Sequence, residues 1–144
     1  MSAALRLPVG LYEKALPAEW SWPKRLDAAV EAGYDYVEIC VDESDERLAR
    51  LQWTAAERAA LRGAIADAGL RSLSLCLSAH RKFPLGSHSP EVRRRSLEIM
   101  QWGIDLAGDL GAKIILIEGY DVFYEPHDEG TVARFIEGLQ QGAA

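Results

Sequence analysis

Three consecutive basic side chains, His80, Arg81 and Lys82, follow an apolar run in the segment "SLCLSAHRKFPLGS". Ser87 to Ser89 come next, and Pro90 then marks the first turn of a predicted helix. The free N–H groups at a helix start favour an anion, and cationic side chains bind phosphate or carboxylate through charge-assisted hydrogen bonds. The segment therefore predicts an anion site, whose alternative is a solvated run of charges.

A second set of polar residues ends the apolar run in "LPVGLYEKALP". Tyr12 closes this run, and Glu13 and Lys14 come directly after it. In parallel α/β folds, ligands gather where strands end and helices begin. Lys14 is therefore a second candidate for the anion site, although charged residues in such a loop are also typical of solvated surface.

Carboxylates occur in two further apolar segments. Glu38 lies within "YVEICV", and Glu118, Tyr120 and Asp121 lie at the end of "KIILIEGYD". These side chains could take part in proton transfer, metal ligation or the binding of sugar hydroxyl groups. Glu38 is predicted to point into the cavity at the strand ends, and its alternative role is a buried pair with an arginine or lysine.

The composition excludes several classes of protein. The 144 residues are 49% hydrophobic and 26% charged, which is typical of a soluble globular domain, and the net charge of −6 argues against a nucleic-acid partner. No apolar run approaches the roughly 18 residues of a membrane span. Cys40 and Cys76 lie inside apolar runs and are predicted to be buried thiols of a reduced, cytoplasmic protein. The sequence has no zinc-ligand spacing, nucleotide-binding glycine motif or Gly-x-Ser-x-Gly motif.

The elements that must position these residues alternate along the chain. Continuous β-rich runs predict strands at 7–12, 36–41, 73–77 and 113–120. Caps and glycine stops predict helices within 23–33, 54–69, 89–111 and 131–141. The apolar face of the last helix is predicted from Val132, Phe135, Ile136 and Leu139.

Four strand–helix pairs predict one α/β domain over residues 1–144, with parallel strands joined by crossover helices. Periodicity leaves open whether this is a small open sheet or part of a (β/α)₈ barrel. A complete barrel needs about 250 residues. The chain would then supply a (β/α)₄ half of one.

Five blocks of the sequence together resemble one enzyme family: "LPVGLYEKALP", "YDYVEICVDESDERLARLQW", "LCLSAHRKFPLGS", "LEIM" and "GYDV". This is the L-ribulose-5-phosphate and L-xylulose-5-phosphate 3-epimerase family, also called hexulose-6-phosphate isomerase-like. The resemblance implies a xylose-isomerase-like TIM barrel, a divalent metal (Mn, Zn or Mg) and epimerisation of a ketopentose 5-phosphate at C3, as in L-ascorbate utilisation. Two glutamates would move the C3 proton, and the metal would stabilise the enediolate.

The resemblance also implies that the basic segment and Lys14 hold the phosphate of the substrate. The candidate substrate-binding residues are Tyr12, Lys14, Glu38, His80, Arg81, Ser87 and Tyr120. In the family, the metal ligands and both catalytic glutamates lie on later strands, so the resemblance assigns no catalytic and no metal-binding residue to this chain. The chain is expected to be the N-terminal half of a barrel, to bind no cofactor and to be inactive alone.

Two functions remain open from the sequence. One is an epimerase by descent, and the other is a non-catalytic half-barrel that binds anions or assembles with another half. The expected partner is a small sugar phosphate, with no nucleic acid and no membrane. Because half a barrel leaves its edge strands unpaired, we expect a homodimer or aggregation through those edges. A DNA-repair nuclease of the same barrel type is disfavoured by the net charge.

Overall fold

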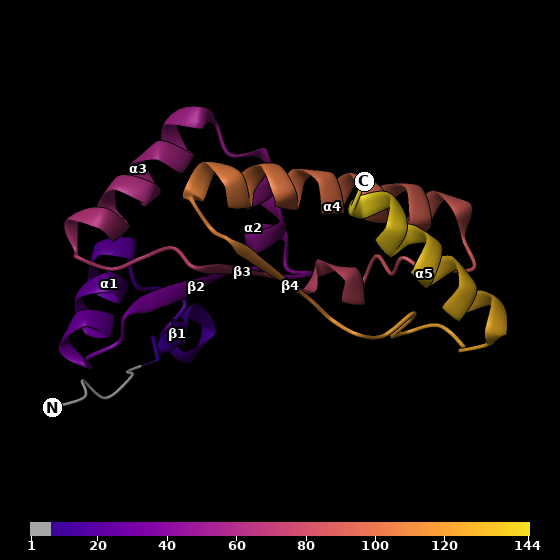
Figure 1. Ribbon diagram of the computed structural model, residues 1–144, viewed down its shortest axis with the longest axis horizontal. Coiled ribbons are helices and arrows are strands. Elements are labelled where there is room, and N and C mark those ends of the chain that lie inside the picture. The colour runs from indigo at the N-terminus through magenta and orange to yellow at the C-terminus, as the bar shows by residue number, and fades with distance from the viewer. Residues whose placement is uncertain (1–6) are drawn as a thin grey trace, which may run out of the picture.

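The computed structural model of the protein describes residues 7–144 as four strands with helices between them (Figure 1). The strands are β1 (Gly10–Tyr12), β2 (Tyr36–Val41), β3 (Ser74–Leu77) and β4 (Ile114–Ile117). The α-helices are α1 (Trp22–Glu31), α2 (Asp45–Leu48), α3 (Ala55–Asp67), α4 (Pro90–Leu110) and α5 (Glu129–Gly142). Short 3-10 helices follow β1, α2 and β3: η1 (Glu13–Ala15), η2 (Ala49–Gln52) and η3 (Ser78–Arg81).

The four strands form one parallel sheet in the order β1-β2-β3-β4. Each strand is joined to the next by a helical crossover, as parallel neighbours require. The predicted α/β fold with four parallel strands is confirmed. No helix of the described residues is both long and apolar enough to span a membrane.

Alternation along the strands gives the sheet two different faces. Val37, Ile39 and Val41 of β2 are fully buried with the core residues of the helices, and Figure 1 shows α3 and α4 above the sheet. The opposite face, which we call the inner face, is the more polar one. It carries Tyr12, Glu38, Cys40, Ser74, Cys76, Ile114 and Leu116.

Local signals define the helix ends as predicted. Thr54 and Glu57 form both halves of a capping box at the start of α3. The Ser89 side chain accepts the Val92 N–H at the start of α4, and Gly111 ends that helix in the left-handed conformation with φ of 80°. These signals work because each one satisfies backbone groups within a few residues of itself.

Three elements differ clearly from the prediction, one of them β4, which ends at Ile117 rather than at Tyr120. β1 begins at Gly10 rather than at Leu7, and the backbone N–H of Val9 bonds the Asp35 carboxylate instead of a neighbouring strand. α5 begins two residues before Thr131, because the Asp128 side chain caps it. The predicted apolar face of α5 is only half covered: Phe135 and Leu139 pack on the core, whereas Val132 and Ile136 are exposed.

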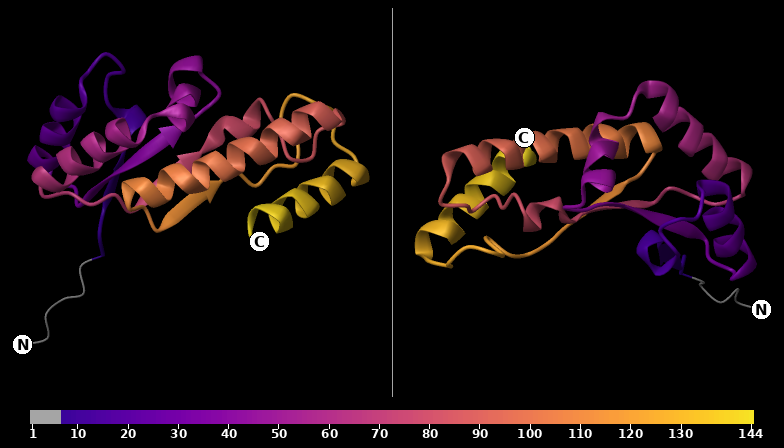
Figure 2. Two further views of the ribbon diagram at one scale, coloured as in Figure 1. Left: turned by 90° about the horizontal axis from the view of Figure 1, so that it is seen from above. Right: turned by 180° about the vertical axis from the view of Figure 1, so that it is seen from behind.

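The segment after η3 packs tightly against the segment after β4. The Gly86 N–H donates to the Asp121 carbonyl at 3.0 Å, and Gly138 of α5 lies against Leu85. A Cβ atom on Gly86 would lie 2.5 Å from the Thr131 carbonyl oxygen. Only glycine therefore allows these two segments to meet, and α5 lies beside α4 in both views of Figure 2.

We predict that Gly86→Ala lowers the free energy of unfolding by about 1–3 kcal/mol, the range for overpacking a tight site. The matched control is Gly63→Ala within α3, where no atom lies within 4 Å of the new methyl group. Because alanine is the better helix former, this control should gain about 0.5–1 kcal/mol. Urea denaturation measures both, and an unchanged midpoint in Gly86→Ala would contradict the close approach.

Candidate functional site

Charged and aromatic residues gather in two groups at the carboxyl ends of the strands. The first, the Glu13 cluster, comprises Glu13, Lys14, Asp42, Arg47 and Arg50 at the ends of β1 and β2. The second, the Arg81 cluster, comprises Arg81, Glu118, Tyr120 and Phe123 at the ends of β3 and β4. This is the edge where parallel α/β folds bind ligands.

Glu13 is fully buried, so the solvated interpretation of this residue is wrong. Its Oε1 atom accepts hydrogen bonds from Arg50 Nη1 at 2.6 Å and from Arg47 Nε at 3.1 Å. Arg50 also donates to the carbonyl oxygen of Cys40 at 2.8 Å, which ties η1 to β2. A buried carboxylate requires such partners, because an unpaired one would cost several kcal/mol. The cluster therefore fixes the loop that carries Lys14.

Lys14 pairs with Asp42, its Nζ atom lying 2.8 Å from Oδ2. Asp42 also accepts hydrogen bonds from the N–H and hydroxyl of Ser44. Burial alone would raise the pKa of Asp42, but the hydrogen bonds from Lys14 and Ser44 outweigh it and hold that pKa at about 2. Asp42 is therefore charged at neutral pH, and the cation of Lys14 is already neutralised within the chain.

Arg81 lies at the carboxyl edge of the sheet, which we call the mouth, among residues from β4 and the loop that follows. Its Nη2 atom is 3.7 Å from Glu118 Oε1, and its guanidinium lies 4.9 Å from the centre of the Phe123 ring. Both partners of this ion pair are partly exposed, with 36% of the Arg81 side chain accessible. Burial raises the pKa of Tyr120, so its hydroxyl keeps its proton at neutral pH.

His80 does not reach this mouth. Its imidazole is buried against α4, with Nε2 3.2 Å from the carbonyl oxygen of Ser96. Burial lowers the pKa of His80, so the ring is neutral at pH 7 and carries no charge toward an anion. The physical reason is the 3-10 turn η3, which continues directly from β3 and turns neighbouring side chains in different directions.

Ser87 is also fully buried, and its hydroxyl donates to Glu125 Oε1 at 2.6 Å. The other carboxylate oxygen of Glu125 accepts the backbone N–H of His88 at 2.8 Å. The segment before α4 thus does bind an anion, but that anion is the carboxylate of Glu125. Within the chain, Ser87 joins the loop after β4 to the start of α4.

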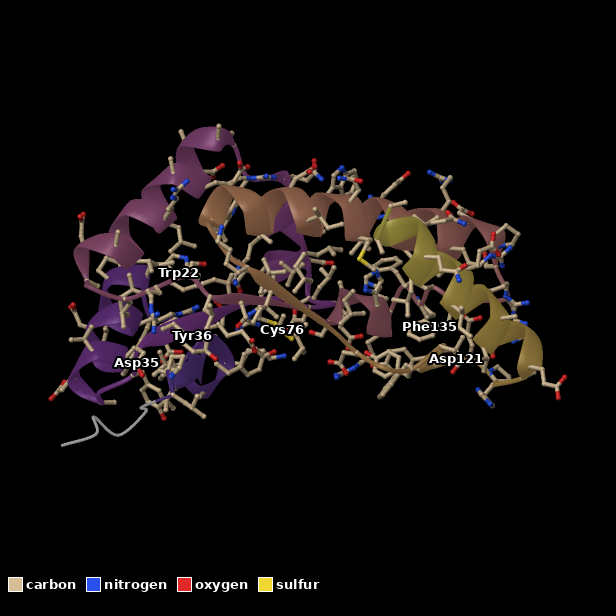
Figure 3. All side chains as sticks on the ribbon, in the orientation of Figure 1. Trp22, Asp35, Tyr36, Cys76, Asp121 and Phe135 are labelled. Atoms are coloured by element: carbon tan, nitrogen blue, oxygen red, sulfur yellow. The ribbon has the colours of Figure 1, made fainter. Side chains whose placement is uncertain are left out.

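The inner face holds the remaining candidates. The Ser74 hydroxyl donates to Glu38 at 2.5 Å, so the partner of this carboxylate is a hydroxyl rather than the arginine or lysine of the alternative prediction. The Tyr12 hydroxyl lies 3.0 Å from the sulfur of Cys40. Figure 3 shows Cys76 near the middle of the sheet, with Tyr36 toward one side and Asp121 toward the other. Glu38 and Tyr12 therefore present oxygen atoms on the face that also leads to the Arg81 cluster.

The arrangement can bind an anion and hydroxyl groups, but its donor set does not fit a resident metal. Within residues 7–144, no three His, Cys, Asp or Glu side chains come together in a way that could hold a metal ion. The carboxylates at the mouth are each engaged by a cation or a hydroxyl of the chain, as Asp42 is by Lys14 and Glu38 by Ser74. We derive no step through a metal on these residues.

The sequence reasoning missed several residues that shape the site: Asp42, Arg47, Arg50, Phe123, Tyr124 and Glu125. Asp42 had a usable signal, since it follows β2 directly in the sequence. The Tyr124 hydroxyl donates to Glu43 at 3.1 Å, across 81 positions of the sequence. A contact of this span leaves no local pattern, and neither does the bond between Ser87 and Glu125.

Comparisons with known proteins agree with this architecture. Residues 26–144 match the family described as xylose isomerase-like TIM barrel. Its structural relatives include D-psicose 3-epimerase with D-tagatose from Clostridium cellulolyticum H10, with a TM-score of 0.77 and 15% identity over 95% of this chain and 47% of that one. An L-ribulose 3-epimerase structure has a TM-score of 0.68 and 22% identity, covering 94% of this chain and 44% of that one.

Curated relatives are much closer in sequence. SgbU of Escherichia coli (strain K12), named as a candidate L-ribulose-5-phosphate 3-epimerase, is 55% identical over 91% of this chain and 46% of its own length. The L-ribulose-5-phosphate 3-epimerase UlaE of Salmonella heidelberg (strain SL476) is 51% identical over 94% of this chain and 48% of its own. The chain thus spans about half the length of the curated relatives it matches. Its four parallel strands and its match over residues 26–144 show that the chain belongs to the xylose isomerase-like TIM barrel family.

Proposed function

We propose that this chain provides the sugar-phosphate side of an epimerase site that acts on L-ribulose 5-phosphate or L-xylulose 5-phosphate at C3. The observation that carries the proposal is the Arg81 cluster, which lies at the ligand-binding edge of a sheet whose curated relatives bear that activity in their names. An arginine is well suited to phosphate because its planar N–H groups can bind two oxygens at once.

Arg81 is the stronger phosphate candidate of the two cations. Its contact with Glu118 is 3.7 Å and partly exposed, so exchange of that carboxylate for a phosphate oxygen costs little. Lys14 is held to Asp42 at 2.8 Å, and 10% of the Asp42 side chain is accessible. Lys14 would therefore stay paired with Asp42 at the edge of the site, while Arg81 makes the direct contact. Tyr120 stands beside Arg81 as a neutral hydroxyl donor.

The inner face is the proposed place of the sugar. Glu38, with Ser74 holding one oxygen, would accept hydrogen bonds from sugar hydroxyl groups, and Tyr12 would flank it. His80 and Ser87 would act indirectly, by holding η3 and the start of α4 in position. The residues thus bind and orient the substrate, which is a prerequisite for proton transfer at C3.

Epimerisation at C3 also requires a base within hydrogen-bond reach of the proton and stabilisation of the enediolate charge. A divalent metal such as Mn²⁺, Zn²⁺ or Mg²⁺ would supply that stabilisation. The described residues do not form a ligand set for it, so we propose that binding and chemistry are divided, with chemistry absent from the isolated chain. We also place the protein in the cytoplasm, where the sugar phosphates of its relatives' names are metabolised.

A second proposal concerns assembly, and one observation favours it. Ile114 and Leu116 of β4 are 53% and 47% exposed on the inner face. On the other face, a groove of about 440 Å³ runs between β4, α4 and α5, lined by Ile104, Ile115, Ile117 and Leu139 among others. Exposed apolar surface beside an unpaired strand edge favours association. We propose that two copies of the chain pair through β4.

Arg81→Ala should weaken the binding of L-ribulose 5-phosphate by about 1.5–3 kcal/mol, the range for a hydrogen bond to a charged group. Isothermal titration calorimetry measures this. The matched control is Arg62→Ala: Arg62 is an exposed arginine of α3 beside Gly111, at the opposite edge of the sheet. Equal affinity in the wild type and in Arg81→Ala would rule out the phosphate assignment, whereas equal losses in both variants would indicate a non-specific charge effect.

The isolated chain should not exchange the C3 proton of L-ribulose 5-phosphate with deuterium from solvent, even with Mn²⁺ or Zn²⁺ present. The reason is that a base and a site for the metal are both needed for this step. Nuclear magnetic resonance follows the exchange, with and without the C-terminal half of a related enzyme. Exchange by the chain alone that disappears in Glu38→Gln would move the catalytic base into this half and refute the division of roles.

The chain should behave as a dimer or larger species in light scattering over a series of concentrations. Leu116→Lys should shift it toward the monomer, because a charge would replace an apolar contact at the β4 edge. Val30→Lys is the matched control, since Val30 of α1 is exposed to the same 47% but lies on a helix. A wild-type monomer at every concentration would refute pairing through β4.

A further inference from the structure

Two cysteines occupy matching positions on neighbouring strands of the inner face. Cys40 of β2 and Cys76 of β3 are direct partners in the parallel register, and neither is in a disulfide. Neighbouring strands are spaced by about 4.7–4.9 Å, which lies within the Cα separation of about 4.4–6.8 Å found in disulfides. Residues in register on parallel strands point to the same face, so the two thiol groups stand side by side.

One hydroxyl group, that of Tyr12, lies within reach of both sulfur atoms. The Tyr12 hydroxyl lies 3.0 Å from the sulfur of Cys40 and 3.8 Å from that of Cys76. The Ser78 hydroxyl lies 3.8 Å from the sulfur of Cys40. Structural cysteines are usually enclosed by apolar atoms and inert. A thiol pair that shares a hydroxyl is a different environment, because hydroxyl donors can stabilise a thiolate.

The two thiols are not equivalent. Hydrogen bonds from Cys76, Tyr12 and Ser78 lower the pKa of the Cys40 thiol to about 7, against the opposing effect of burial. The hydrogen bond with Cys40, together with burial, raises the pKa of Cys76. One member of the pair is therefore poised as a thiolate nucleophile near neutral pH, and the other as the protonated thiol that completes a disulfide.

We propose that Cys40 and Cys76 form a peroxide-reactive dithiol that closes reversibly to a disulfide between β2 and β3. The Cys40 thiolate attacks one oxygen of hydrogen peroxide, the O–O bond breaks, and with one proton the products are a sulfenic acid and water. The sulfur of Cys76 then attacks the sulfenic sulfur, and the departing hydroxide takes up the Cys76 proton as a second water. Overall, two thiols and one peroxide give one disulfide and two waters.

The size of the oxidant follows from the burial of the pair. Cys40 is fully buried and Cys76 is 5% exposed, so a small neutral oxidant can reach them where a bulky one cannot. Hydrogen peroxide fits this requirement, and glutathione disulfide does not. The inference does not rest on the sugar-phosphate proposal, because oxidation of the thiols requires neither Arg81 nor a substrate, although Tyr12 takes part in both.

The test is to treat the reduced 144-residue chain with hydrogen peroxide, quench it in acid, and alkylate it with N-ethylmaleimide in urea. Intact-mass analysis should find a monomeric chain that has lost two hydrogens and takes up no alkyl group, with both sites restored by dithiothreitol. Glutathione disulfide at the same concentration should react at least tenfold more slowly. Peptide mapping should place the bond between Cys40 and Cys76.

Two variants separate the roles of the thiols. In Cys76→Ser, the sulfenic acid of Cys40 should persist and be trapped by dimedone, whereas Cys40→Ser should react severalfold more slowly because the nucleophile is gone. Tyr12→Phe, which keeps both thiols and the ring, should slow oxidation at pH 7 because the thiolate loses a hydrogen bond. Two alkylated thiols after peroxide treatment of the folded wild type, or a disulfide only between two chains, would overturn the proposal.

Discussion

The buried carboxylate of Glu13 is the constraint on which the carboxyl edge of the sheet depends. Removing one partner from a buried ion pair costs about 3–5 kcal/mol, so the arginines around Glu13 cannot move independently of it. They come from η2 and from the α2 turn, and one of them also binds the backbone of β2. A single charge in the interior therefore fixes three loops, and the position of Lys14 beside Asp42 follows from it.

The need of a charged group for an oppositely charged partner also explains how the charges at the carboxyl edge of the sheet are arranged. In this acidic chain, the two cations proposed for the site already have carboxylate partners: Lys14 has Asp42 and Arg81 has Glu118. An incoming phosphate must therefore exchange with a carboxylate rather than meet an unpaired charge. The cost of that exchange is smaller at a long, partly exposed contact than at a short, buried one. This difference, more than the number of basic residues, selects Arg81 as the proposed contact.

The elements were predictable from the sequence because their signals are local. The capping box at Thr54, the proline at the start of α4 and the glycine at its end each act within a few residues. The site was less predictable. His80 was expected at the mouth because it follows a strand, but its direction depends on a 3-10 turn and on a carbonyl of α4 sixteen residues away. Distant contacts of this kind decide which side chains of a charged run remain available.

The register of β2 connects the fold to the chemistry. Successive side chains of a strand point to opposite faces of the sheet. Val37, Ile39 and Val41 therefore lie in the core. The residues between and after them, Glu38, Cys40 and Asp42, lie on the inner face and at the edge of the sheet. A slip of one residue would place these polar side chains under the helices and expose the valines and isoleucine. The hydrophobic effect that builds the core thus also selects the polar face, without any contribution from a ligand. Tyr12 joins the two parts of that face, since its backbone leads into Glu13 and its hydroxyl holds the thiol pair.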